Sequence, residues 1–377
     1  MNFDLTEEQE MLRKMAKDFL ANECPKKLVR EMEVDEKGHP PELWRKMAEL
    51  GWTGLPFPEK FGGGGGSFLD LSVLLEEMGR ACLPGPFFST VVLGGLTILD
   101  LGSEEQKKSL LPQIAQGKLL LTLALTEPSG SYGASSIECR ARADGDNFVL
   151  EGTKLFVTDA GVADYIICVA RTADSARPEE GLSLFLVDAH SPGLSCLPLE
   201  TMAGDKQYEV AFKGVRVPRG NLLGELNKGW AGVKRILSRS AAAKSVEMVG
   251  GAQQVLEMTV QYAKDRVQFG RPIGSFQAIQ HYCANMAIDV DGCRFVAYKA
   301  AWALSEGMPA TMEVSAAKAW VGEAYRRLTA LSHQIHGAIG FTKDHDLYLY
   351  YARAKTGETI FGDGDFHREM VAQGLGL

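Results

Sequence analysis

The stretch Phe148-Val-Leu-Glu-Gly-Thr-Lys-Leu-Phe-Val-Thr158 decides the fold class of this 377-residue chain. Its apolar and β-branched residues alternate with polar ones, which is the pattern of a half-buried strand. Similar runs cover 165–170, 182–187 and 210–217, and Gly, Asp, Asn and Pro separate them. Parallel strands need long, usually helical crossovers, and no helical pattern lies between these runs. We therefore expect an antiparallel β domain here.

Both flanks of this central region have helical periodicity. Before it, the predicted helices cover 6–21, 42–50, 69–81 and 103–116, and Thr6 with Gln9 forms a capping box. After it, they cover 230–265, 275–307, 310–337 and 344–358. The sequence thus predicts an α+β chain of three parts, which are an N-terminal helical domain (1–120), a middle β domain (121–228) and a C-terminal helical domain (229–377).

Composition narrows the functional classes. The net charge is -8 and no Lys/Arg-rich run is present, which argues against nucleic acid or an anionic membrane as partner. The seven cysteines are scattered without a Cys-x-x-Cys motif, as in proteins that keep reduced thiols. The acidic, polar N-terminus differs from signal and transit peptides, and the apolar run at 119–125 is too short to span a bilayer. We expect a cytoplasmic protein that does not bind membranes.

Several motifs receive only a structural interpretation. The glycine run 62–66 has no preceding strand and no following Lys-Ser/Thr, so we interpret it as a flexible connection rather than a phosphate loop. His333 and His336 lie three residues apart on a predicted helix without a third ligand at metal spacing, so we expect no metal site. A Gly-x-Ser-x-Gly nucleophile motif is absent from the sequence, which leaves hydrolase chemistry without support.

Four further segments are weak alone but specific in their order. Thr126-Glu-Pro128 follows an apolar strand, and Phe156-Val-Thr158 ends another. Arg266-x-x-Phe269-Gly270 and Gln334-Ile-His-Gly337 follow in the C-terminal region. Together with Pro58-x-x-Phe61-Gly62-Gly63 and Phe212-x-x-Val215-x-Val217-Pro218, they cover essentially the whole chain, and in this order they resemble the segments of the acyl-CoA dehydrogenases.

The resemblance implies an N-terminal helical domain, a middle β domain and a C-terminal four-helix bundle that bind FAD. Hydroxyls of Thr126 and Thr158 would donate to the polar edge of the isoalloxazine, and Phe156 would cover one flavin face. Arg266 suits the pyrophosphate, because a guanidinium fork matches its oxygens, and Phe269 suits the adenine. For Arg266 the alternative is a surface salt bridge.

The same resemblance implies an oligomer. Gln277, Gln334 and the backbone at Gly337 are similar to groups that reach the FAD of a neighbouring subunit. We therefore expect a homotetramer, or a heterotetramer with a related subunit, and an electron-transfer flavoprotein as electron acceptor. The CoA-binding segment departs from the family, because Gly130-Ser-Tyr-Gly133 replaces the usual Ala-Gly-Ser-Asp. Either Ser131 or Tyr132 would then meet the substrate.

The second departure concerns the catalytic base. The usual C-terminal ending is Ile-Tyr-Glu-Gly-Thr, whose Glu takes the substrate α-proton, but Ile360-Phe-Gly-Asp-Gly364 puts Gly362 at that position. Other members carry the base in the helix after Trp230, where this chain has Ser240. A base must therefore lie elsewhere in the chain, come from a partner, or be missing.

Glu247 is the first candidate base and Asp363 the second. Glu247 lies two helical turns after Ser240 and has apolar and small neighbours, an unusual setting for a charge. Gly250 and Gly251 indicate that another element packs closely there. The alternative for Glu247 is an i, i+3 pair with Lys244 on a solvated face.

Two functions from different classes follow. The first is FAD-dependent α,β-dehydrogenation of an acyl-CoA to a 2-enoyl-CoA. A base on the helix, together with space vacated at Gly362, favours a branched, cyclic or aromatic acyl group. The second is a non-catalytic FAD-binding subunit of a heteromeric acyl-CoA dehydrogenase. An oxidase that passes electrons to oxygen would differ only in solvent access to the flavin.

Overall fold

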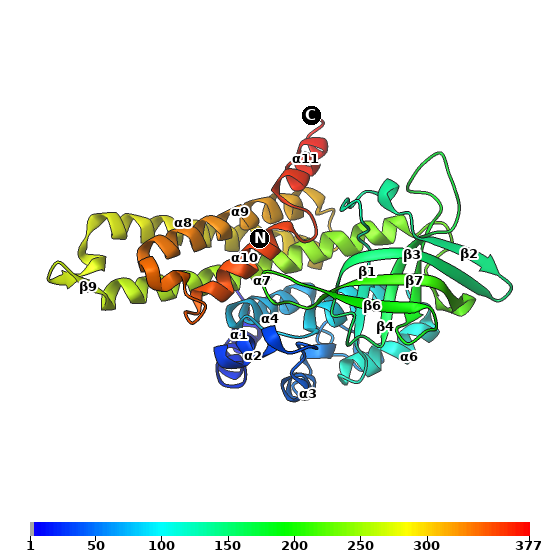
Figure 1. Ribbon diagram of the computed structural model, residues 1–377, viewed down its shortest axis with the longest axis horizontal. Coiled ribbons are helices and arrows are strands. Elements are labelled where there is room, and N and C mark those ends of the chain that lie inside the picture. Colours follow the sequence, from blue (N-terminus) through cyan, green and yellow to red (C-terminus); the bar gives the residue numbers. More distant parts are fainter. Residues whose placement is uncertain (1–3) are drawn as a thin grey trace. The chain divides into compact units, whose positions relative to one another are not determined.

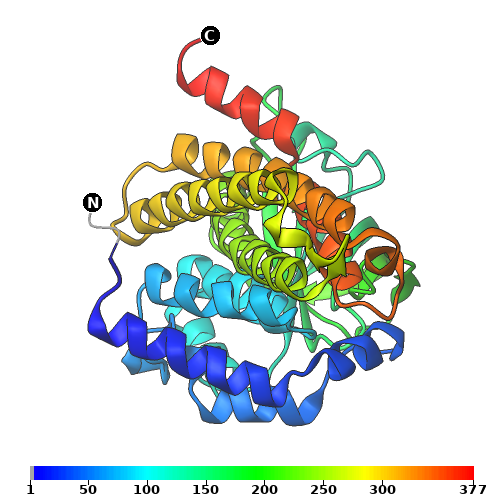
Figure 2. The same ribbon diagram turned by 90° about the vertical axis from the view of Figure 1, so that its left-hand side faces the viewer.

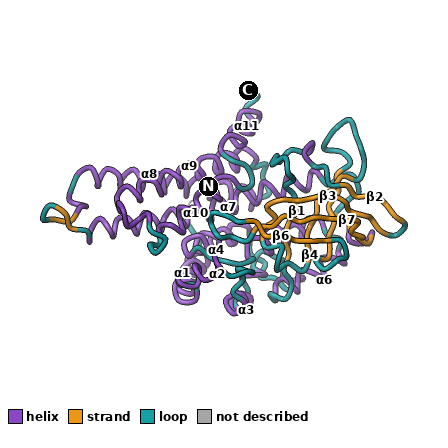
Figure 3. Tube along the Cα trace, in the orientation of Figure 1, coloured by secondary structure: helices purple, strands orange, loops and turns teal. Residues whose placement is uncertain are grey.

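The computed structural model describes residues 4–377, in which helices precede and follow a central run of strands as predicted (Figure 3). By their internal contacts the residues form two compact units. The first unit comprises Met1–Arg30, Ser67–Leu83 and Ser238–Leu377, and the second comprises Glu31–Gly66 and Pro84–Leu237. The three-part division at residues 120 and 228 stays a prediction. No helix in residues 4–377 is long and apolar enough to cross a membrane.

The first unit is built from helices (Figure 1). They are α1 (Glu7–Glu23), α4 (Phe68–Ala81), α8 (Gln277–Ser305), α9 (Thr311–His336), α10 (Leu347–Thr359) and α11 (Gly364–Gly374). The helices α2 (Lys26–Val34) and α7 (Trp230–Asp265) have residues in both units. The predicted capping box starts α1, because Gln9 N donates to Thr6 Oγ1 (3.2 Å) and Thr6 N to Gln9 Oε1 (3.1 Å). The helix α11 was not predicted.

The long helices α7, α8 and α9 lie side by side in the first unit (Figure 2). Thr259 Oγ1 on α7 and Ser332 Oγ on α9 are 2.7 Å apart in the buried seam. Where α4 crosses α7, a Cβ added to Gly250 would lie 1.7 Å from the Glu76 carbonyl oxygen, and one added to Gly79 would lie 1.8 Å from that of Glu247. The close packing that the glycines indicated is confirmed, and it fixes the backbone of Glu247.

The second unit contains the sheet together with α3 (Pro41–Glu49), a π-helix (Phe88–Gly95), α5 (Leu96–Leu101) and α6 (Glu104–Ala115). The strands are β1 (Leu121–Ala124), β2 (Arg140–Asp144), β3 (Asn147–Thr158), β4 (Tyr165–Arg171), β5 (Leu182–Asp188), β6 (Leu194–Leu199), β7 (Gln207–Pro218) and β8 (Leu222–Leu223). Their order is β6-β7-β3-β2-β4-β5-β8, and β1 pairs with β4.

The sheet is antiparallel in its β2–β3, β3–β7, β4–β5, β5–β8 and β6–β7 pairs, as expected. The pairs β1–β4 and β2–β4 are parallel and depart from that expectation. The chain between β1 and β4 contains the β2–β3 hairpin, which provides the length that a parallel crossover needs. A helix between parallel strands is therefore not required here.

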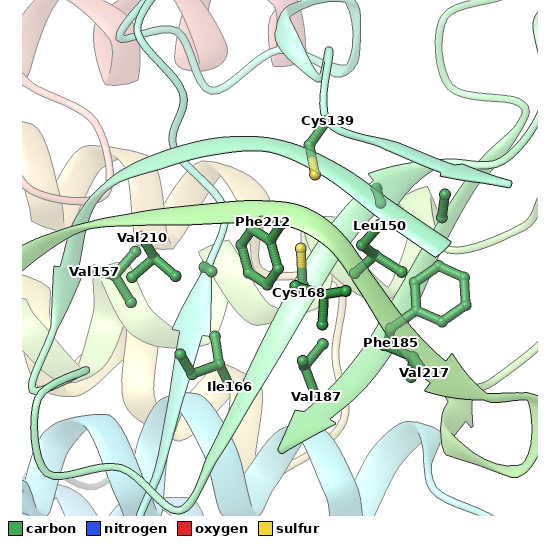
Figure 4. Packing of buried hydrophobic residues seen from close by; sticks show 14 of the residues in the cluster. Cys139, Leu150, Val157, Ile166, Cys168, Phe185, Val187, Val210, Phe212 and Val217 are labelled. Carbon is green, nitrogen blue, oxygen red and sulfur yellow. The ribbon is translucent and has the colours of Figure 1, made fainter. Parts of the chain in front are cut away.

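A cluster of buried side chains from the strands forms the core of the second unit (Figure 4). The rings of Phe148 and Phe185 lie 4.9 Å apart in it, and Leu150, Val187 and Phe212 are fully or almost fully buried. The alternation of the opening sequence stretch is thus the alternation between this core and the other face of β3.

The glycine run at 62–66 is a fixed loop, so the prediction of a flexible connection was wrong. Backbone N–H groups of Gly64, Gly65 and Gly66 donate to carbonyls of residues 54, 57 and 55 at 2.8 to 3.0 Å. A Cβ on Gly63 would lie 2.1 Å from the Phe57 carbonyl oxygen. The glycines therefore serve close backbone approach.

Candidate active site

The ring of Phe156 is presented by a strained bulge in β3. Its φ is +56°, which is rare for a bulky residue, and the register of β3 on β7 shifts between Lys154 and Val157. The side chain is 53% exposed. Strain of this kind costs on the order of 1–3 kcal/mol and is typical of functional sites. The bulge turns an aromatic face outward, as a flavin contact requires.

A buried ion pair fixes the end of β1 against β3. Lys154 Nζ donates to Glu127 Oε1 (2.6 Å) and to the Leu125 carbonyl (3.1 Å), and the exposed fractions of the Lys154 and Glu127 side chains are 0% and 4%. Leu155 N donates to the Thr126 carbonyl (2.8 Å), so Thr126 lies beside the strand that carries Phe156. The sequence analysis did not predict this pair, although Lys154 inside a strand was the available signal.

The other predicted residues of the second unit lie close to these strands or on a loop. Thr158 is half-buried, and its carbonyl accepts from Thr122 Oγ1 at 2.5 Å, which places it next to β1. Ser131 lies on an exposed turn, where its Oγ accepts from Gly133 N (3.2 Å), and Tyr132 is half-buried. Thr126, Phe156 and Thr158 are therefore brought together, whereas Ser131 belongs to the loop that follows.

In the first unit, a two-residue hairpin presents Phe269. Strands β9 (Val267–Gln268) and β10 (Arg271–Pro272) pair across Phe269-Gly270, whose φ values of +53° and +76° define a type I′ turn. The Phe269 ring is 93% exposed. Arg266 is exposed and has no ion pair within the described part of the chain, so the salt-bridge alternative has no partner there.

Gln277, Gln334 and Gly337 lie at helix ends of the same unit. Gln277 begins α8, and Gln334 lies in the last turn of α9; both are exposed. Gly337 ends α9 with φ +65° and ψ −143°, a conformation that favours glycine. Tyr262, one turn before Arg266, stacks on His336 with ring centroids 4.3 Å apart and donates to the His336 carbonyl (3.2 Å). Arg266 and Gly337 therefore belong to one end of the bundle.

Each unit offers groups of a kind that suits part of a flavin dinucleotide. In the second unit, an outward aromatic ring beside two threonines suits a flavin ring system. In the first unit, an exposed guanidinium near an exposed phenylalanine suits a pyrophosphate and a base. Among residues 4–377, no three His, Cys, Asp or Glu side chains are close enough to hold a metal ion.

Glu247 lies on α7 in a half-buried position. Its Oε2 is 2.6 Å from Lys244 Nζ, and the side chains of Lys244 and Glu247 are 16% and 26% exposed. Lys244 and Glu247 thus form the i, i+3 pair that was the alternative interpretation of Glu247, but the pair lies on a largely buried face of α7 rather than on a solvated one. The turn after Glu247 is held by contacts at both glycines, since a Cβ on Gly251 would lie 2.3 Å from the hydroxyl of Tyr325.

Position 362 is closed to side chains. Gly362 has φ +100°, and a Cβ there would lie 2.4 Å from Phe366 Cδ1 and 2.8 Å from His367 Nε2. The expectation that the missing Glu leaves open space is therefore wrong at this point, because Phe366 and His367 of α11 occupy it.

Two buried side chains, those of Lys318 and His367, fasten the loop before α11. Lys318 Nζ donates to the carbonyls of Gly362 (2.7 Å) and Glu358 (3.0 Å), and His367 Nε2 lies 3.0 Å from the Phe361 carbonyl. Burial, and next to it the charge of Lys244, lowers the pKa of Lys318 to about 7. Burial likewise lowers the pKa of His367 to about 4, so its imidazole is neutral near pH 7.

Asp363 has a structural task in the same loop. It is the N-cap of α11, and its Oδ1 accepts from Phe366 N at 2.9 Å. The carboxylate is exposed and engaged with the helix end. Its role as N-cap of α11 is enough to explain why an acid stands at position 363, and no role in proton transfer is needed to explain it.

Comparisons with known proteins agree with this geometry. Residues 6–118, 122–215 and 227–376 match the N-terminal, middle and C-terminal domains of acyl-CoA dehydrogenases. The chain is 35% identical to a probable acyl-CoA dehydrogenase, YngJ, of Bacillus subtilis over the full length of both. It is 33% identical to cyclohex-1-ene-1-carbonyl-CoA dehydrogenase of Geobacter metallireducens over 98% of each chain. The structure of butyryl-CoA dehydrogenase from Megasphaera elsdenii superposes over all of both chains with a TM-score of 0.92 and 30% identity.

Proposed function

Because this chain belongs to the acyl-CoA dehydrogenase family of oxidoreductases, we propose that it oxidises an acyl-CoA thioester to the 2-enoyl-CoA with Glu247 as the base. Glu247 takes the α-proton as its carboxylate becomes a carboxylic acid, and the electrons of that C–H bond form the new double bond. A bound FAD would supply the hydride acceptor for the β-hydrogen, and the electrons would leave to an electron-transfer flavoprotein.

One observation carries the assignment of the base. Of the two predicted carboxylates, the one on α7 is half-buried on a turn whose backbone is fixed by Gly79 and Gly250. The other caps a helix in solvent, and the family's usual position is closed by Phe366 and His367. A general base needs a fixed, largely dry position, and Glu247 is the candidate that has one.

The chain's own residues would hold the cofactor in two groups. Thr126, Phe156 and Thr158 of the second unit take the ring system, and Arg266 and Phe269 of the first take the pyrophosphate and adenine. Gln277, Gln334 and Gly337 would reach the cofactor of a neighbouring subunit in a homotetramer or heterotetramer. The purified protein should be yellow, and Arg266→Ala should lose FAD while its fold is kept. A colourless protein that takes up no added FAD would refute this part.

We further propose a branched, cyclic or aromatic acyl group. With the base on a helix instead of the C-terminal loop, the α-carbon is approached from a different element, which suits an acyl group bulkier than a straight chain. The relative from Geobacter metallireducens is named for a cyclic substrate, whereas that from Megasphaera elsdenii is named for a straight-chain one. Ser131 or Tyr132 would contact the CoA portion.

A turnover survey decides the substrate class. Butyryl-, octanoyl- and palmitoyl-CoA are compared with branched, alicyclic and aryl-substituted thioesters, using an artificial electron acceptor. We expect kcat/KM to be highest in the second group. Preference of the isolated protein for a straight chain would overturn the substrate proposal and leave the family assignment untouched.

Gly362 also favours a second candidate function, a non-catalytic FAD-binding subunit that needs a related partner for its base. Such a chain would bind FAD but leave it oxidised with every thioester, and would gain activity when the partner is added. Reduction of the flavin by the isolated chain would exclude it.

A further inference from the structure

Lys244 and Glu247 form an i, i+3 ion pair on α7 that is largely buried. Their Nζ and Oε2 atoms lie 2.6 Å apart, and the side chains are 16% and 26% exposed. In the turn before α7, Glu225 and Lys228 form a pair with the same sequence spacing and distance, but their side chains are 74% and 73% exposed. The two pairs share spacing and distance and differ in burial.

Lys244 is the one partner of the Glu247 carboxylate in residues 4–377. No other hydrogen bond or ion pair reaches that carboxylate there. Its neighbours Val246, Met248 and Val249 are buried and apolar. Removing a carboxylate from water disfavours its charged form, and an ammonium at hydrogen-bond distance offsets this. Lys244 is thus the group that holds the Glu247 carboxylate in place.

Charged and titratable groups on the surrounding helices do not replace Lys244. On α9, burial raises the pKa of the Tyr325 phenol. The charges of Cys82, after α4, and of Glu247 add to this rise, and the charge of Arg353 on α10 opposes it. Lys318, also on α9, is committed to two carbonyls.

On the premise that Glu247 is the base, we propose that Lys244 is a positioning residue for it. The ammonium holds the carboxylate turned toward the preceding turn of α7 until substrate arrives. In the proton step Glu247 alone gains a proton, and Lys244 affects the reaction through the orientation of the carboxylate. Its removal should therefore slow proton abstraction without abolishing it.

The test is the pH dependence of flavin reduction in single turnovers of the FAD-bound protein, from pH 5.5 to 9, with one thioester that the wild type oxidises. For Lys244→Met the rate of flavin reduction should fall by about tenfold across this range, as expected when a base loses its fixed position. Lys244→Arg keeps a cationic donor and should restore the rate. Lys228→Met removes the exposed pair of equal N–O distance and should leave the rate unchanged.

Two outcomes overturn the inference, and they are distinguishable. If Glu247→Gln is inactive but Lys244→Met reduces the flavin at the wild-type rate, Lys244 has no such role and the base assignment stands. If Glu247→Gln reduces the flavin normally, the base assignment itself fails. Thermal unfolding of each variant checks the fold, and Lys244→Gln replaces Lys244→Met if the latter does not fold.

Discussion

The turn of α7 that carries Glu247 and the loop between α10 and α11 that carries Gly362 differ in how they use glycine. On α7, Gly250 lets the backbone of α4 approach, and the carboxylate of Glu247 keeps a single side-chain partner. In the loop, Gly362 allows a φ of +100° and leaves no room for a side chain, while the neighbouring carboxylate of Asp363 caps a helix.

The comparison teaches that a carboxylate near the expected place is not enough to identify a base. The two acids differ in the hydrogen-bond partners and the burial that the local structure gives their carboxylates. Asp363 accepts from the backbone N–H of Phe366 in solvent, whereas Glu247 is bound, within residues 4–377, only to a lysine side chain in a largely buried position. The predictions below test this distinction.

The largest effect is expected for Glu247→Gln. The amide keeps the shape and can still hydrogen-bond, but it cannot accept the α-proton. Flavin reduction by substrate should slow by at least ~100-fold, the contribution of a positioned general base. Anaerobic stopped-flow absorbance measures the rate. Retention of the wild-type rate would remove Glu247 from the mechanism.

The next effect concerns Gly362→Ala. A Cβ would meet Phe366 and His367 at 2.4 and 2.8 Å, in a backbone conformation that disfavours alanine. We expect a loss of about 2 kcal/mol in unfolding free energy from strain and overpacking. Gly307→Ala is the matched control, because Gly307 has φ +67° and no neighbour within 4 Å of an added Cβ. It should cost less, and equal losses would show that packing around Gly362 is not tight.

Lys318→Met tests how the loop is fastened. The pKa of Lys318 is lowered to about 7, below the 10.5 of a free lysine, so the unfolded chain binds more protons between these values. Stability from this group therefore rises with pH, by about 1.5 kcal/mol between pH 7 and 8.5. The difference in unfolding free energy between wild type and Lys318→Met, followed by denaturant titration, should change by this amount. A pH-independent difference would contradict the shifted pKa.

The smallest effect is expected for Asp363. Asp363→Ala removes the N-cap of α11 and should cost about 1 kcal/mol of stability. Asp363→Asn keeps a capping oxygen and should be nearly neutral. Both should reduce the flavin at the wild-type rate, and thermal unfolding with stopped-flow rates measures the two properties separately. A rate loss in Asp363→Asn without a stability loss would move the base to the loop.

The periodic parts of the fold could be predicted from the sequence because period and capping are local. The helices around 6–21 and 230–265 and the strand at 148–158 appear where their patterns place them. The same local signal failed for β1 and β4, because their parallel pairing depends on a hairpin inserted between them. It failed also for the loop at 62–66, whose glycines pack on backbone from residues 54–57.

For the candidate site, too, some features could be predicted from the sequence and others could not. Gly250 and Gly251 indicated close packing beside Glu247, and that prediction is confirmed: glycine weakens a helix, and here the close approach of a neighbouring helix requires it. The closed position at Gly362 could not be predicted, since it depends on how α11, a helix that the sequence analysis did not predict, packs against the loop. The buried pair of Lys154 and Glu127 lies far apart in sequence, and only the folded chain shows that the two charges meet.

Exchange of the substrate α-proton tests the central claim most directly, because it isolates the proton step from flavin reduction. The FAD-bound protein is incubated anaerobically in D2O with a thioester that binds, and deuterium at the α-carbon is followed by mass spectrometry. We predict that Glu247→Gln slows incorporation by at least ~100-fold while Asp363→Asn exchanges at the wild-type rate. Normal exchange in Glu247→Gln, with loss in Asp363→Asn, would contradict the claim that the base of this chain lies on α7.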